Sequence, residues 1–373
     1  MQRRTIEVRP DWQHRVEEIG LTYHSHEAGP YWDESAYYEF TAGEIEVLEM
    51  AANTLHELCL EAVDAVITEN WWHRLCIPKS AVELIRKSWE RDDFSLYGRF
   101  DVAYDGQSPP KLLEYNADTP TALVEASVAQ WFWLQERFKD CDQFNSIHER
   151  LIAAWKKIGG ECVRFAAVKD HPEDEQTVTY LQDTCHQAGL VTKRVAIEEI
   201  GWNEKRAAFV DLEDQKITAC FKLYPWEWLW EEEFAAFLPQ EPCRWIEPPW
   251  KMVLSNKGIV PILWELFSGH PNLLPAFESP EPFAGSYVRK PKLSREGANI
   301  QWMCEGRVIH ETAGDYADGE CIFQEPASIP DFNGHHPVLG LWIVNNESAG
   351  LGIREDTSLI TSNLSRFVPH VFA

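Results

Sequence analysis

The sequence predicts a mixed α/β (α+β) protein, and three stretches of the 373-residue chain support this class. Residues 41–67 place apolar side chains at helical spacing behind Thr41, which is suited to cap a helix together with Glu44. Residues 97–116 alternate polar and apolar side chains on both sides of a Gly/Pro-rich turn, a pattern that predicts a β-hairpin. Residues 161–197 follow the order strand, helix, strand, which is typical of a βαβ unit.

Local sequence signals predict further elements along the chain. Helices are expected over residues 79–91, 119–138 and 146–160, the last of which ends in a glycine pair. A second hairpin is expected over residues 207–225. The aromatic stretch 225–238 is interpreted as an amphipathic helix that packs against a neighbour rather than binds a ligand.

The charge and composition of the chain exclude several classes of function. The formal net charge is −26, from 60 acidic and 34 basic residues, which argues against nucleic acid as a partner. No stretch approaches the roughly 18 consecutive apolar residues of a membrane span, so no membrane partner is expected. The nine cysteines are scattered and form no CxxC pair, and the N-terminus lacks the apolar core of a signal peptide. These features predict a cytoplasmic protein, and no sequence feature indicates an oligomeric state.

The first hairpin carries a group of polar residues on one face. Because side chains alternate along a strand, Arg99 and Asp101 share a face of the first strand, and Glu114 and Asn116 share a face of the second. Three of these are hard oxygen donors of the kind that holds Mg²⁺ together with substrate phosphates. The alternative is a solvated polar face on an exposed hairpin. Arg99 favours the functional interpretation, because phosphoryl chemistry needs an anion clamp beside the metal.

The last third of the chain holds residues suited to bind phosphate. Lys290 lies in an apolar strand just ahead of the glycine-containing loop SREGANI, which is centred on Gly297 and could act as a lid. Lys257, taken alone, is equally well explained as a surface charge. The sequence contains neither GxxxxGK[ST] nor GxGxxG, so a Walker-type loop and a Rossmann fingerprint are both excluded.

Five blocks in this order resemble the synthetase domain of the glutathionylspermidine synthase family: YGRFD, KLLEYNADTP, SNKGIVPILWEL, SYVRKPKLSREGANI and REDTSLITS. The resemblance implies an ATP-grasp fold of the glutathionylspermidine/glutathione synthetase type, with an inserted small α/β lobe and a lid. The chain would form a single unit over 1–373 in a stand-alone form without the family's amidase domain. Within it, residues 160–225 would form the substrate lobe and residues 285–325 the nucleotide lid region.

The resemblance also implies a role for individual residues. Arg99 would contact the γ-phosphate of ATP and the acyl-phosphate, and Arg354 would be a second arginine facing the reacting phosphate. The implied Mg²⁺ ligands are Asp101, Glu114 and Asn116. The implied ATP contacts are Lys257, Lys290, the loop around Gly297, and Gln324, Glu325 and Ala327 beside the adenine.

Glu173 and Asp174 have two interpretations. They begin the helix of the βαβ unit, where acidic residues simply complement the helix dipole. The resemblance implies instead that they hold a cationic amine in the active-site cleft.

The function expected from these features is an ATP- and Mg²⁺-dependent carboxylate–amine ligase that forms an amide bond through an acyl-phosphate. Its substrates would be small molecules, a peptide-like carboxylate and an amine or polyamine. One alternative is a nucleotide-binding ATP-grasp protein without ligase turnover. Another is a kinase that stops at the phosphorylated carboxylate.

Overall fold

The centre of the computed structural model, which describes residues 1–27, 29–159 and 162–373, is an antiparallel sheet with strand order β20–β19–β18–β5–β6. Strands β5 and β6 form the predicted hairpin, and their register sets Arg99 opposite Asn116 and Asp101 opposite Glu114. The hairpin prediction is therefore confirmed. The strands of this sheet are β5 (Tyr97–Ala103), β6 (Lys111–Asn116), β18 (His336–Val344), β19 (Glu347–Asp356) and β20 (Arg366–Phe367).

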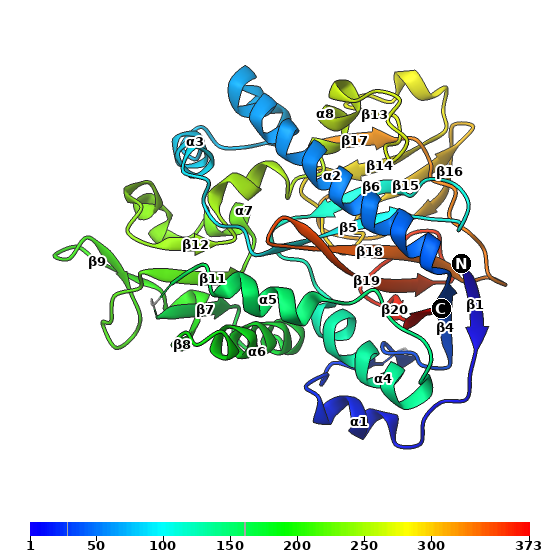
Figure 1. Ribbon diagram of the computed structural model, residues 1–373. Helices are drawn as coiled ribbons and strands as arrows, with labels where there is room; N and C mark the ends of the chain where they lie inside the picture. Colours follow the sequence, from blue (N-terminus) through cyan, green and yellow to red (C-terminus); the bar gives the residue numbers. More distant parts are fainter. Residues whose placement is uncertain (28, 160–161) are drawn as a thin grey trace.

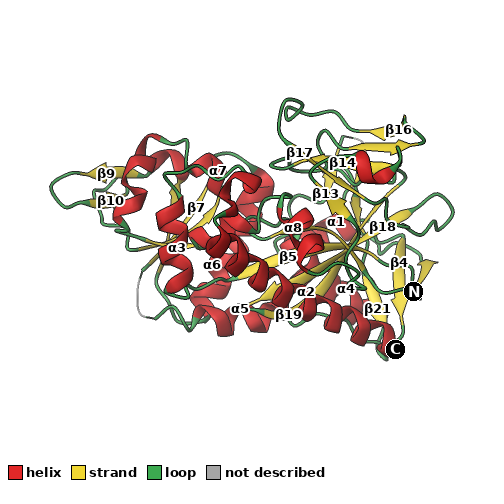
Figure 2. Ribbon diagram, turned by 90° about the horizontal axis from the view of Figure 1, so that it is seen from above, coloured by secondary structure: helices red, strands yellow, loops and turns green. Residues whose placement is uncertain are grey.

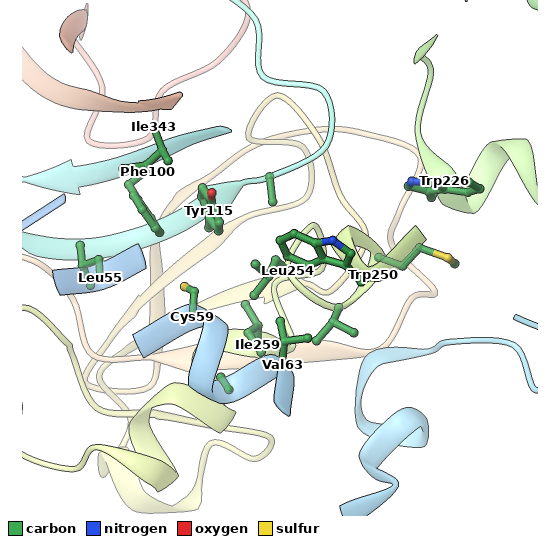
Figure 3. Close-up of a cluster of buried hydrophobic side chains, with 14 of the residues drawn as sticks. Leu55, Cys59, Val63, Phe100, Tyr115, Trp226, Trp250, Leu254, Ile259 and Ile343 are labelled. Atoms are coloured by element: carbon green, nitrogen blue, oxygen red, sulfur yellow. The ribbon is translucent and has the colours of Figure 1, made fainter. Parts of the chain in front are cut away.

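The long helix α2 (Ala42–Glu69) crosses one face of the central sheet (Figure 1). It begins with the predicted capping box, in which Thr41 Oγ1 accepts a hydrogen bond from the Glu44 backbone N–H at 3.2 Å. Below the helix, the rings of Phe100 and Tyr115 stack with centroids 3.9 Å apart, and Figure 3 shows them in one apolar cluster with residues of α2. Because strand side chains alternate, burial of these rings turns the polar residues of the hairpin toward the opposite face.

A parallel sheet with strand order β12–β11–β7–β8 lies beside the central sheet. It contains the predicted βαβ unit, whose helix packs on β7. Residues 160 and 161, at the start of the lobe expected over 160–225, lie outside the described residues, and the sheet takes in β12 beyond residue 225. The elements of this region are α5 (Ile147–Trp155), β7 (Val163–Ala167), α6 (Pro172–Gln187), β8 (Thr192–Ala196), β11 (Ala219–Leu223) and β12 (Arg244–Ile246).

The hairpin expected over residues 207–225 is only partly confirmed. The chain turns back after β10 (Ala208–Val210), where Val210 forms an antiparallel bridge with Lys216, but β10 pairs mainly with β9 (Gly201–Asn203) and β11 joins the parallel sheet between β7 and β12. Every residue of β11 is buried, so this strand needs the interior of a sheet that is covered on both faces.

A third sheet, antiparallel with strand order β13–β17–β14–β15–β16, lies at the other end of the molecule (Figure 2). Its strands are β13 (Ala276–Phe277), β14 (Tyr287–Pro291), β15 (Gln301–Cys304), β16 (Arg307–Glu311) and β17 (Cys321–Gln324). The loop between β14 and β15 contains the SREGANI segment and returns toward the central sheet. A small sheet of order β1–β4–β21 brings the two chain ends together.

The remaining elements complete the layers around these sheets. The helices are α1 (Trp12–Glu18), α3 (Val82–Glu90), α4 (Gln130–Arg137), α7 (Trp226–Leu229) and α8 (Ile259–Leu266), and the strands are β1 (Gln2–Thr5), β2 (Ser25–His26), β3 (Gly29–Pro30), β4 (Ala36–Phe40) and β21 (His370–Phe372). Among the described helices, none is both long enough and apolar enough to cross a membrane.

A buried ion pair joins the parallel sheet to the polar hairpin. Lys222 Nζ on β11 lies 2.5 Å from the carboxylate of Asp118, just beyond β6, and both side chains are almost completely buried. The second oxygen of Asp118 accepts a hydrogen bond from the Trp226 backbone N–H at 2.9 Å. Each partner therefore compensates a charge that would otherwise be stranded in the core.

We expect Lys222→Met to lower the free energy of unfolding by about 3–5 kcal/mol, because it leaves the Asp118 carboxylate buried without its cation. Urea denaturation measures this change. The control is Lys216→Met, since Lys216 is exposed and precedes the same strand. A loss below about 1 kcal/mol, the range of a surface pair, would show that the buried pair does not stabilise this joint.

Candidate active site

Two cavities meet at the polar face of the central hairpin. The first cavity lies toward the third sheet, and its wall includes Lys290, Gln324 and Ala327. The second cavity has a volume of about 320 Å³ and extends toward the parallel sheet. Asp101 and Glu114 line both cavities, so the carboxylates of the hairpin stand where the two spaces join.

Arg99 and Asp101 form a bidentate ion pair at this junction. Arg99 Nε and Nη2 donate to the two carboxylate oxygens of Asp101 at 2.6 and 2.9 Å, and Nη1 donates to the Thr121 carbonyl at 2.6 Å. The Asn116 amide donates to Asp101 at 3.1 Å and to Glu114 at 3.3 Å. The structure thus brings together the residues that the sequence placed on one face.

Gly340 provides the space for the Arg99 side chain. A Cβ at this position of β18 would lie 2.7 Å from Arg99 Cδ, so the arginine crosses β18 only where no side chain stands. Two residues along the strand, the Trp342 ring lies 5.8 Å from the guanidinium carbon. Sequence reasoning missed Gly340, because a glycine in a strand carries no local sign of which distant side chain crosses it.

Two lysines compensate the charge of Glu114. Lys257 Nζ lies 3.2 Å from the Glu114 carboxylate, and Lys290 adds a second positive charge nearby. Burial acts to raise the pKa of Glu114, but these ammonium groups outweigh it and lower the pKa. Burial lowers the pKa of Lys290 to about 8, although Glu114 acts in the opposite direction. Lys257 is therefore suited to exchange its carboxylate partner for an anionic ligand, and the Lys290 ammonium, which donates to the Leu113 carbonyl and to Gln324, lies beside the same site.

The end of the first cavity away from the junction is lined by both polar and apolar groups. Gln324 is buried, accepts from Lys290 Nζ at 2.7 Å and donates to the Leu112 carbonyl at 2.9 Å. Glu325 and Ala327 continue along the wall. The apolar side chains of Val288, Ile300, Trp302 and Ile360 also line this cavity. A flat heteroaromatic ring would find both apolar contact and hydrogen-bond partners here.

Arg354 faces the junction from β19. It lines the second cavity together with Arg99, and its guanidinium donates to the Ser362 carbonyl. A third, smaller cavity has Arg99, Arg354 and Thr361 in its wall. The two guanidinium groups thus flank one small space, an arrangement suited to an anion.

The donor set of the hairpin fits a hard divalent cation such as Mg²⁺. Asp101 and Glu114 offer carboxylate oxygens, and the Asn116 amide offers a further oxygen once it turns from its present contacts. The described residues contain no group of three or more His, Cys, Asp and Glu side chains arranged to hold a metal. This site has two carboxylates and one amide, so phosphate and water oxygens would have to complete the shell.

The loop after β14 lies against the central sheet. Gly297 has a φ of +71°, and a Cβ there would lie 2.2 Å from the Thr361 carbonyl oxygen. The Lys257 ammonium donates to the Ser294 carbonyl at the start of the loop. Gly297 lines both cavities, so the SREGANI segment covers their junction.

The two acidic residues at the start of α6 differ in their position relative to the second cavity. Asp174 lines the second cavity, whereas Glu173 is not part of its wall. Burial raises the pKa of Glu173, opposed by Arg354 and reinforced by Glu296 of the SREGANI loop. Burial also raises the pKa of Asp174, and Glu296 adds to the effect. Carboxylates from two separate elements therefore repel one another across this side of the cavity.

The family model described as glutathionylspermidine synthase preATP-grasp matches residues 3–373. The chain belongs to this family. Membership places it among the ATP-dependent ligases that form C–N bonds.

Individual relatives are similar over different shares of their length. A Haemophilus influenzae protein provisionally named an acid–amine ligase is 39% identical, and the match covers 98% of both chains. Trypanothione synthetase of Crithidia fasciculata is 29% identical over 84% of this chain. Bifunctional glutathionylspermidine synthetase/amidase of Escherichia coli is 28% identical over 89% of this chain. The chain spans only 53% and 58% of the lengths of these last two relatives.

A solved structure supports the fold independently of sequence. The glutathione synthetase-like effector of Globodera pallida, in its apo form, superposes with a TM-score of 0.60 at 9% identity, covering 98% of each chain. This likeness, together with the family match, confirms the ATP-grasp synthetase fold that the sequence predicted.

In this glutathionylspermidine synthase family member, the single helix expected over residues 225–238 is wrong, because the α-helix covers only Trp226–Leu229 and a 3₁₀ segment follows at Glu233–Gln240. The expected packing against neighbours is confirmed for the apolar side chains, since those of Trp226, Leu229, Phe234, Ala235 and Leu238 are buried. Trp228 differs from them, because it is 41% exposed and lines the second cavity. Its exposure depends on a distant cavity, which no local periodicity reports.

We expect Gly340→Ala to reduce ligase turnover at least tenfold with only a modest loss of stability, because the new methyl group displaces Arg99 rather than a core side chain. Steady-state ADP release and thermal unfolding together check this. The matched control is Gly43→Ala, where a Cβ meets nothing within 4 Å and a helical alanine is favoured. Normal turnover in Gly340→Ala would show that Arg99 does not need its path across β18.

Proposed function

We propose that the protein uses ATP and Mg²⁺ to activate a peptide-like carboxylate as an acyl-phosphate and then joins it to an amine or polyamine. The observation that carries this proposal is the shared position of Asp101 and Glu114 at the junction of two cavities. A nucleotide in the first cavity would present its γ-phosphate to a carboxylate in the second. This arrangement is what transfer between two bound substrates requires.

The chemistry needs two displacements. A carboxylate oxygen attacks the γ-phosphorus and ADP leaves; the amine then attacks the acyl carbon, phosphate leaves, and the nitrogen releases a proton. Mg²⁺, held by Asp101, Glu114 and Asn116, would neutralise phosphate charge when bound. Arg99 and Arg354 would stabilise the charge on the transferring group from the two sides of the junction.

The nucleotide contacts follow from the wall of the first cavity. Lys257 would exchange Glu114 for ATP phosphates, and Lys290, whose ammonium donates to the Leu113 carbonyl and to Gln324, would turn toward the same phosphates. Gln324, Glu325 and Ala327 would lie beside the adenine. The loop around Gly297 would exclude water from the mixed anhydride, which hydrolyses when exposed.

Two other functions share this geometry. A binding protein without turnover would hold ATP but release no ADP with any substrate mixture. A kinase would release ADP and accumulate a phosphorylated acid without an amide. The second cavity favours the ligase, because it offers space beside the arginines for a further substrate.

We expect Asp101→Asn and Glu114→Gln each to reduce substrate-stimulated ADP release by at least a hundredfold, because each removes a negative charge from the proposed Mg²⁺ site. The assay is ADP release with ATP, Mg²⁺ and mixtures of peptides and amines, with amide product followed by mass spectrometry. Glu305→Gln, at an exposed position between β15 and β16 and outside both cavities, is the charge-matched control.

Near-normal turnover of Asp101→Asn at ordinary Mg²⁺ concentrations would place the metal elsewhere. ATP binding without ADP release above background in the unaltered protein would favour the binding module. ADP release with no amide product would favour the kinase.

The amine would bind where the carboxylates gather. Asp174 lines the second cavity and Glu173 lies near it, with Glu296 contributing charge from the loop. Burial and neighbouring negative charge raise the pKa of Glu173 and of Asp174, and a bound cation would relieve this strain. The names of the E. coli and Crithidia relatives, which refer to glutathionylspermidine and trypanothione synthesis, support an acceptor of the polyamine class.

We expect the double variant Glu173→Gln/Asp174→Asn to raise the KM for the amine at least tenfold while the KM for ATP changes less than twofold, because the charge is lost only at the acceptor side of the second cavity. Initial-rate kinetics with the amine and ATP varied separately measure both constants. Glu175→Gln on the same helix turn is the control, since that carboxylate pairs with Arg194 outside the cavity. An unchanged amine KM, or a preference for an anionic amino acid as acceptor, would contradict this assignment.

A further inference from the structure

The guanidinium of Arg295, in the SREGANI loop, is held on three sides by groups of the protein. Its Nη2 lies 2.5 Å from a carboxylate oxygen of Glu227, and its Nη1 donates to Thr119 Oγ1 at 2.8 Å. Its central carbon lies 5.5 Å from the centroid of the Trp228 ring. A carboxylate, a hydroxyl and an aromatic face together make a favourable environment for an organic cation.

The three groups that surround this cation do not depend on the loop for their position. Glu227 and Trp228 belong to α7, whose first turn is held by the hydrogen bond from the Trp226 backbone N–H to Asp118. Thr119 follows directly on Asp118 in the segment after β6. The cradle is thus part of the rigid joint between the two sheets, and only its occupant comes from the lid.

The cradle opens into the second cavity. Thr119, Trp228 and Arg295 line that cavity together with Asp101 and Glu114 at its junction end. Its volume of about 320 Å³ is many times the roughly 30 Å³ share of one water molecule, so it accommodates an organic substrate. A substrate reacting at the junction would therefore have the cradle within the same space.

We propose that Glu227, Trp228 and Thr119 form a cation subsite for an ammonium or guanidinium group of a substrate, and that Arg295 occupies it in the ligand-free protein as an internal substitute. The existence of the subsite follows from the cradle alone. Its assignment to a substrate rests on the proposed function.

When a substrate cation replaces Arg295, the Glu227 carboxylate keeps a partner of opposite charge. When Arg295 leaves, the partly buried Glu227 carboxylate loses its cation, and a bound substrate cation restores the pair. Substrate binding in the cradle and release of Arg295 from it are therefore a single competition.

The first experiment measures binding of methylguanidinium by titration calorimetry and needs no turnover. Arg295→Ala empties the cradle and is expected to bind the probe at least tenfold more tightly than the unaltered protein. Adding Glu227→Gln or Trp228→Leu to Arg295→Ala should abolish this gain. Arg307→Ala is the control, because it removes the same charge from an exposed position on β16, in the sheet from which the SREGANI loop extends. Thermal unfolding verifies that each variant is folded.

The proposal is overturned if folded Arg295→Ala gains no affinity for methylguanidinium, or if the gain persists after both cradle substitutions. Because this readout is independent of catalysis, it stands even if no ADP release is ever found. Failure of the ligase function and failure of the subsite are thus separate results.

A second experiment identifies the source of the cation. Dissociation constants are measured for 1,4-diaminobutane and for a tripeptide with a free or an acetylated α-amino group, in the unaltered protein and in Glu227→Gln. Loss of affinity for the diamine assigns the subsite to the acceptor amine. Loss for the free tripeptide alone assigns it to the α-ammonium of the acid. Unchanged affinity for all three overturns the assignment to a substrate.

Discussion

Buried ion pairs beside the central and parallel sheets hold β5 and β6 in place. Asp118 and Lys222 form one pair, and Glu247 and Lys251 form a second, in which Glu247 accepts the Leu96 backbone N–H at 2.9 Å. Lys251 donates to main-chain carbonyls at the start of β5 and just after β6. Because an unpaired charge is so costly in a core, β5 and β6 keep one position relative to the parallel sheet. The arrangement of the active site depends on this constraint.

The site itself is charge-compensated before any ligand binds. Arg99 is satisfied by Asp101, and Lys257 by Glu114, so the cations and carboxylates of the site neutralise one another. Under the proposed function, a nucleotide with its metal would supply both signs of charge at once, and each internal pair would exchange for an external partner. Each buried charge would then keep a partner of opposite sign, which limits the cost of desolvation.

Sequence reasoning succeeded where the signal is local and failed where it is not. The capping box of α2, the register of the polar hairpin and the βαβ unit all follow from patterns within a few residues. The place of β11 in the parallel sheet, the crossing of Gly340 by Arg99 and the exposure of Trp228 depend on partners far away in the chain. The sequence identified the loop that contains Arg295, but it did not predict the contacts of the Arg295 side chain.

The short segment after β6 has a length that the structure does not allow to change. Thr119 accepts a hydrogen bond from Arg295 through its hydroxyl, and Thr121 accepts one from Arg99 through its main-chain carbonyl. The backbone from Thr119 to Thr121 thus sets the spacing between Arg99 of the central sheet and Arg295 of the SREGANI loop. Substitution at position 121 leaves the carbonyl in place, whereas a single inserted residue would separate the two anchors. Family members that keep both arginines should therefore vary in composition at position 121, but not in the length of this segment.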